Sequence, residues 1–166
     1  MAIPIVADGH IDATDFIGDR VKTISPASFK DGSDTVELSI TNYGSYIVSN
    51  SDTAIGTGFC GLDFLPDGAV IKSIKVYWFR DDAAATGEVD LVRVTKATSA
   101  ESVLASADSD ASTGNHTVET VLGTPETIDT TTYSYHLFLK LNPNDGNADV
   151  KFRSAEIKIT IDNPRP

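Results

Sequence analysis

The sequence predicts an all-β protein, an antiparallel β-sandwich of jelly-roll type with about eight to ten strands and little helix. Two observations support this prediction. Apolar and polar residues alternate in several runs along the chain, and clusters rich in Gly, Asn and Asp separate these runs. Short alternating runs divided by turn clusters are typical of sandwiches and jelly rolls. The length of 166 residues suits a single domain with a buried core.

The first half of the chain contains two clear strand patterns. Over residues 36–40, Val, Leu and Ile alternate with Glu and Ser, which is the two-residue period of a half-buried strand. Residues 66–68, Pro-Asp-Gly, form a turn signal that leads into a long strand. In that strand Ile74, Val76 and Trp78 point to one side, so we expect them to face the core.

The second half adds three strand patterns. Residues 88–95 are rich in β-formers. Over residues 133–141 one face of the strand carries Tyr135, Leu137, Leu139 and Leu141, and the other carries His136, Phe138 and Lys140. Residues 150–161 form the last strand, in which the apolar positions change from even to odd. One extra residue in a strand exchanges its faces, so we predict a β-bulge near Arg153-Ser154. The predicted core comprises Ile74, Val76, Trp78, Leu137, Leu139, Ile157 and Ile159.

Helix signals are weak and occur at two places. Residues 12–21 allow a turn or two of helix, and residues 98–107 suit a strand equally well. The stretch before residue 36 has the weakest β pattern. We therefore predict an N-terminal arm or extended segment over residues 1–35, packed on a β-sandwich domain over residues 36–166.

The charge and the cysteine count exclude several classes of protein. The chain has 13 Lys and Arg against 24 Asp and Glu, a formal net charge of −11, which repels phosphate backbones and argues against nucleic-acid binding. A single cysteine, Cys60, excludes an internal disulfide framework and a cysteine zinc site. No apolar stretch is long enough to span a membrane, and no secretory signal follows Met1, so we expect the protein to be made in the cytoplasm.

Two motifs have both a structural and a functional interpretation. Residues 56–61 fit GxGxxG, but that motif binds dinucleotides only where it joins a strand to a helix, and no helix pattern follows it. Glycines that allow a close approach between strands explain it better. Residues 142–149 place Asn and Asp oxygens at the close spacing of calcium loops, yet they lack the terminal glutamate of an EF-hand. A hairpin connection uses the same residue types, so calcium stays an alternative.

No residue pattern indicates catalysis. His10, His116 and His136 lie far apart and have no metal-ligand spacing, and no GxSxG motif is present. We therefore assign no catalytic, cofactor-binding or metal-binding residues, and we predict that the protein is not an enzyme.

An aromatic strip is predicted on the second face of the long strand. Tyr77 and Phe79 share this face with Lys75. Such a strip binds sugars by stacking, forms a second buried face, or contacts another subunit.

Two stretches, residues 65–79 and 133–161, resemble β-sandwich segments of uncharacterised bacterial and phage proteins. The chain also resembles phage head decoration (cement) proteins, which are small jelly rolls, in its size, acidity, strand content and cytoplasmic start. The positions that match the β-sandwich segments are Leu65, Pro66, Gly68, Ala69, Ile71, Val76, Tyr77, Tyr133, Ser134, Tyr135, Ile157, Ile159 and Thr160.

This resemblance implies a non-enzymatic virion structural protein, a capsid decoration or minor capsid subunit. Such a protein would self-associate, as a homotrimer, and bind the major capsid protein, and it would be located in the virion after synthesis in the host cytoplasm. The alternative is a carbohydrate-binding or adhesive β-sandwich of a cell surface or appendage.

Overall fold

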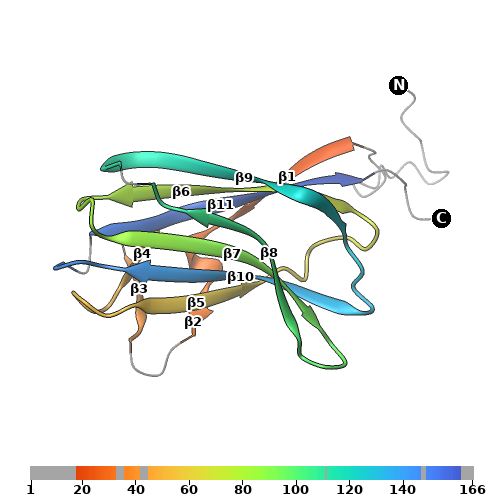
Figure 1. Ribbon diagram of the computed structural model, residues 1–166, viewed down its shortest axis with the longest axis horizontal. Coiled ribbons are helices and arrows are strands. Elements are labelled where there is room, and N and C mark those ends of the chain that lie inside the picture. The colour runs from red at the N-terminus through yellow and green to blue at the C-terminus, as the bar shows by residue number, and fades with distance from the viewer. Residues whose placement is uncertain (1–17, 33–35, 42–44, 111, 147–148, 162–166) are drawn as a thin grey trace, which may run out of the picture.

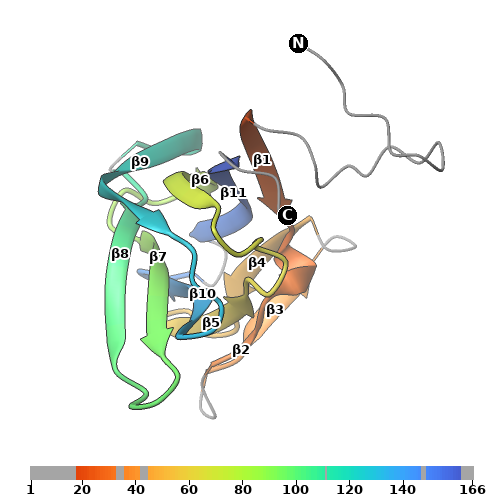
Figure 2. The ribbon, with the colours of Figure 1, turned by 90° about the vertical axis from the view of Figure 1, so that its right-hand side faces the viewer.

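The computed structural model describes residues 18–32, 36–41, 45–110, 112–146 and 149–161, and these residues form a two-layered β-sandwich (Figures 1 and 2). The predicted all-β class is confirmed. Eleven strands are present among the described residues, slightly more than predicted, together with one 3₁₀ turn, η2 (Pro26–Ser28). No helix among these residues is long and apolar enough to cross a membrane.

One layer is a six-stranded sheet in which the order is β3-β4-β11-β6-β9 and β1 also pairs with β11. The β1 strand and the β4 strand follow one another along the same edge of β11. All pairings are antiparallel. The bounds of these strands are β1 (Gly18–Ile24), β3 (Leu38–Thr41), β4 (Tyr46–Ser49), β6 (Val70–Arg80), β9 (Gly114–Thr127) and β11 (Val150–Ile161).

The other layer is a five-stranded antiparallel sheet with the order β2-β5-β10-β7-β8. Figure 2 shows β8 beside β9 at one side of the sandwich, where the Thr120 hydroxyl donates a hydrogen bond of 2.7 Å to the Ser106 carbonyl. The bounds of these strands are β2 (Lys30–Asp31), β5 (Gly56–Gly61), β7 (Thr86–Thr95), β8 (Glu101–Asp108) and β10 (Tyr133–Asn142).

The core lies between the two sheets, and all seven predicted core residues are fully buried in it. Trp78 packs edge-on against Phe152, with ring centroids 5.9 Å apart. On its other side Trp78 lies against Gly87, where a Cβ atom would come within 2.8 Å of the Trp78 Cη2 atom. The close contact explains why the strand opposite Trp78 carries a glycine at this position.

The predicted bulge in the last strand is confirmed. The register between β11 and β6 shifts between Phe152 and Ser154. Because of this shift, Phe152 on the even positions and Ala155 on the odd positions both point into the core and are fully buried. A second register shift lies between Lys158 and Ile159.

The N-terminal stretch contributes strands to both sheets. The β1 strand pairs with β11 from Gly18↔Ile161 to Ile24↔Ala155, and β2 pairs with β5. The β8 strand, residues 101–108, includes residues 101–107 of the second helix candidate, so the strand interpretation of that part of the segment is confirmed. Residues 12–17 of the first candidate lie outside the described residues, and its last residues belong to β1. The division at residue 35 stays a prediction.

Candidate functional site

The outer face of the five-stranded sheet carries a groove over β5 and β10. Along β10, Leu137 and Leu139 point into the core, so the intervening His136 and Phe138 point outward. The antiparallel register with β5 places Phe138 directly opposite Phe59, and His136 directly opposite Gly61.

The hollow of this groove arises at Gly61, because glycine has no side chain to fill the space beside His136. A Cβ atom at Gly61 would lie 3.6 Å from the Asp63 Oδ2 atom, so the Asp63 carboxylate borders the hollow. The groove has a volume of about 400 Å³. Its lining consists of Gly32, Phe59, Gly61, Asp63, Glu101, Ser134, Tyr135, His136 and Phe138.

Two phenyl rings form the apolar side of the groove. Phe59 is 42% exposed. Phe138 is partly exposed beside it. The Lys140 ammonium lies 5.4 Å from the centroid of the Phe138 ring and pairs with Glu88 at 2.9 Å and with Asp90 at 3.2 Å. These contacts bound the phenyl pair on the side away from Gly61.

Polar groups line the rest of the groove. The side chains of Asp63 and Glu101 are exposed, and both carboxylates are hydrogen-bond acceptors. Burial lowers the pKa of His136, although the nearby Glu101 carboxylate acts in the opposite direction. At neutral pH the imidazole is therefore uncharged, with one donor and one acceptor nitrogen. Phenyl rings beside a few hydrogen-bonding groups form the kind of surface that holds a small organic ligand in one orientation.

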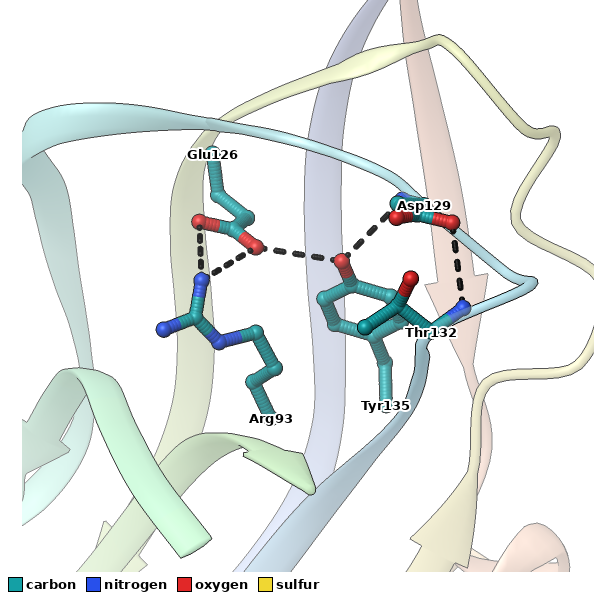
Figure 3. A network of polar contacts seen from close by, with 5 residues as sticks. All are labelled: Arg93, Glu126, Asp129, Thr132 and Tyr135. Carbon is teal, nitrogen blue, oxygen red and sulfur yellow. Dashed lines mark hydrogen bonds and ion pairs between the residues drawn. The ribbon is translucent and has the colours of Figure 1, made fainter. Parts of the chain in front are cut away.

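A polar network lies on the buried side of β10, between the two sheets at one end of the sandwich (Figure 3). The Tyr135 hydroxyl donates a hydrogen bond of 3.1 Å to Glu126 Oε1 and accepts one of 3.2 Å from the backbone N–H of Asp129. Glu126 also pairs with Arg93, whose Nη1 atom lies 3.0 Å from Oε1. Burial raises the pKa of Tyr135 to about 12, so its hydroxyl keeps its proton in this network at neutral pH.

The glycine motif at residues 56–61 forms strand β5, and no helix follows it in the described residues. A dinucleotide site of the strand-turn-helix type is therefore excluded here. A Cβ atom at Gly56 would lie 2.9 Å from the Leu38 Cδ2 atom, and one at Gly58 would lie 2.9 Å from the Lys30 carbonyl oxygen. The interpretation of these glycines as sites of close approach between strands is confirmed.

The loop at residues 142–149 is held by its own hydrogen bonds. Asp149 Oδ2 accepts the backbone N–H groups of Asn144, Asp145 and Gly146, at 3.2, 3.0 and 2.8 Å. Carboxylate oxygens of Asp82, Asp145 and Asp149 also lie within 4.8 Å of one another. The loop joins β10 of the five-stranded sheet to β11 of the six-stranded sheet, so it is not the hairpin connection that the residue types also suit. The hydrogen bonds explain its Asn and Asp residues as a tight turn between the sheets, and we assign no metal to this loop.

The histidines and the aromatic strip are distributed over both layers. His116 lies on β9 and His136 on β10, in different sheets, while His10 lies outside the described residues. Tyr77 and Phe79 are partly exposed on the outer face of the six-stranded sheet, so the strip is not a second buried face. The Tyr77 hydroxyl donates a hydrogen bond of 3.0 Å to Glu156.

Sequence reasoning did not identify the Phe59–Phe138 groove. The alternation over residues 133–141 places Phe138 on the face opposite the leucines, and Phe59 falls within the glycine motif. The available signal was a phenyl ring among His, Ser and Lys on the outward side of a half-buried strand, because that position exposes a large apolar group.

No protein-family model matches the chain, and no curated protein matches its sequence. Several solved structures are similar in fold. A xylan-binding module of family 15 superposes with a TM-score of 0.53 at 11% identity, and the match covers 88% of this chain and 100% of that one. The family 22 xylan-binding domain of xylanase 10C from Paenibacillus barcinonensis gives 0.51 at 12% identity, covering 84% and 98%.

A third structure contains a family 22 carbohydrate-binding module together with a family 10 glycoside hydrolase module. It is the N-terminal part of xylanase 10B from Clostridium thermocellum, complexed with xylohexaose, and it matches with a TM-score of 0.56 at 15% identity. The match covers 90% of this chain and 29% of that one. These likenesses show a shared fold. The β-sandwich part of the predicted resemblance is confirmed, and its decoration-protein part gains no support from these three structures.

Proposed function

We propose that the protein is a non-catalytic module that binds a carbohydrate chain in the groove over β5 and β10. The observation that carries this proposal is the exposed Phe59–Phe138 pair beside the hollow at Gly61. A sugar ring presents an apolar C–H face and a rim of hydroxyls. The phenyl pair offers an apolar surface of similar extent, and Asp63, Glu101 and His136 offer hydrogen-bonding partners for the rim.

The fold supports the same function. The three similar structures are described as carbohydrate-binding or xylan-binding modules, and two of them match over nearly their whole length. This likeness favours the carbohydrate-binding alternative over a capsid decoration protein. Self-association as a trimer and contact with a major capsid protein stay predictions.

The test is a binding assay with neutral, linear oligosaccharides, followed by substitutions in the phenyl pair. Titration calorimetry with xylohexaose and cellohexaose should detect binding to the wild-type protein. Phe138→Ala and Phe59→Ala should each weaken it about tenfold or more, as expected for an aromatic group at the centre of an interface. Both side chains point outward, so neither substitution should lower the melting temperature much.

Tyr77→Ala is the matched control, since Tyr77 is an aromatic residue on the outer face of the opposite sheet. We expect this variant to bind as the wild type does. The proposal is overturned if the wild-type protein binds neither hexamer and none of a panel of neutral polysaccharides. Loss of binding in Tyr77→Ala, with full binding in Phe138→Ala, would move the site to the six-stranded sheet.

A further inference from the structure

We propose that the groove selects uncharged sugar chains and excludes chains that carry carboxylates, through Asp63 and Glu101. This inference rests on the proposed function, because it concerns the ligand of the same groove. It adds a property that the phenyl pair alone does not provide, since a phenyl ring stacks on a neutral sugar and on a uronic acid alike.

The charges that line the groove have one sign. Asp63 and Glu101 are acidic, and no Lys or Arg is among the lining residues in the described part of the chain. His136 adds no positive charge at neutral pH, because burial lowers its pKa. Within the groove a carboxylate of a ligand would therefore meet two carboxylates of the protein and no cation.

Three lysines lie near the groove without lining it. Lys96 borders an adjoining hollow that Asp63 also lines, and its ammonium donates a hydrogen bond of 2.6 Å to the Thr130 carbonyl. Lys140 pairs with both Glu88 and Asp90, which together carry more charge than it does. Lys30 pairs with Phe59 in the β2–β5 register and so lies on the far side of Phe59 from β10, where it does not line the groove. The whole chain has a formal net charge of −11, which adds repulsion at longer range.

The physical consequence differs between neutral and acidic ligands. Hydroxyl groups donate hydrogen bonds to carboxylates, and such charge-assisted bonds are strong, so Asp63 and Glu101 suit a neutral polyol. Two like charges about 6 Å apart, at the effective dielectric of a partly exposed site, repel enough to weaken binding about tenfold or more. Salt screens this repulsion, so the discrimination should depend on ionic strength.

The experiment compares an acidic hexamer with two neutral hexamers. Cellohexaose and cellohexauronate share one backbone, and the second carries a carboxylate in place of each C6 hydroxymethyl group. Xylohexaose is a second neutral hexamer. Each is titrated into the wild-type protein at low and at high sodium chloride, and the measured quantity is the ratio of the cellohexauronate Kd to the lower of the two neutral Kd values.

We expect this ratio to be about ten or more at low salt and to fall at high salt. The double variant Asp63→Asn/Glu101→Gln should bring the ratio close to one. The control variant Asp81→Asn/Glu37→Gln removes the same net charge at exposed positions outside the groove and should leave the ratio high.

The outcomes separate the two proposals. Equal or tighter binding of cellohexauronate by the wild-type protein overturns charge selection and leaves carbohydrate binding in place. If the double variant leaves the Kd ratio unchanged, or if the control variant lowers it equally, then Asp63 and Glu101 do not cause the selection. Failure of all three hexamers to bind overturns the proposed function, and charge selection with it.

Discussion

Arg93 and Glu126 join the two sheets at one end of the sandwich. Arg93 lies on β7 of the five-stranded sheet and Glu126 on β9 of the six-stranded sheet, and Arg93 Nη1 donates to both carboxylate oxygens, at 3.0 and 3.2 Å. The Glu126 carboxylate raises the pKa of Arg93. Arg93 also stacks on Tyr133, with its Cζ atom 4.5 Å from the ring centroid. Since Tyr135 bonds to the same carboxylate, the cross-link reaches the strand that carries the groove.

Glu126→Gln should therefore lower the free energy of unfolding by about 1 kcal/mol. The ion pair is partly shielded from solvent, and the Glu126 carboxylate also accepts a third hydrogen bond, from the Tyr135 hydroxyl. The side chains of the pair are 29% and 15% exposed, whereas those of the Lys158–Asp19 pair are 43% and 57% exposed. Asp19→Asn is the control and should cost less, because exposed ion pairs contribute little. Urea unfolding of both variants measures the difference. Equal destabilisation by the two would mean that the cross-link between the sheets adds nothing beyond a surface ion pair.

Asp129, at the same end of the sandwich, makes the free energy of unfolding depend on pH. Hydrogen bonds from Thr131, above all, and from Thr132 lower the pKa of Asp129 from its ordinary 3.8 to about 2. A carboxylate whose pKa is lower in the folded state adds stability above the pKa of the unfolded state. That stability is lost as the pH falls toward the folded value.

Asp129→Asn should accordingly be less stable than the wild type at pH 7, and the gap should narrow between pH values of about 4 and 2. Urea midpoints of both proteins, measured at several pH values in this range, test the expectation. Asp81→Asn, at an exposed loop position, should show no such gap. A gap that stayed constant down to a pH of about 2 would show that the charge of Asp129 contributes no stability.

The strands that could be predicted from the sequence are those with one buried and one outward face. Leu137 and Leu139 recur at every second position of β10 and are fully buried, and the change of phase along β11 located the bulge between Phe152 and Ser154. The β1 strand was missed for a physical reason. Most of its residues are partly or fully exposed as it lies along the edge of β11, so it needs no apolar alternation.

The groove could not be predicted in the same way, because it depends on pairing between segments that lie far apart in the chain. Phe59 and Phe138 become neighbours only through the β5–β10 register. The hollow at Gly61 exists only because His136 is its partner in that register. A single strand pattern shows which side chains point outward, but not which of them meet.

Gly61 provides the last prediction, which separates binding from stability. Gly61→Val should fill the hollow beside His136 and abolish oligosaccharide binding. It should change the free energy of unfolding by no more than about 1 kcal/mol, since Val is favoured in strands. Apart from the two chain neighbours of Gly61, the described atoms nearest to a Cβ atom there belong to the exposed Asp63, whose Oδ2 atom lies 3.6 Å away.

Gly123→Val is the matched control. Gly123 lies on β9 in the other sheet, and a Cβ atom there would meet nothing within 4 Å. This variant should keep both its stability and its binding, as judged by urea unfolding and by titration with the same neutral hexamers. Undiminished binding in Gly61→Val would mean that the ligand does not enter the hollow, and the site would then be restricted to the phenyl rings of Phe59 and Phe138.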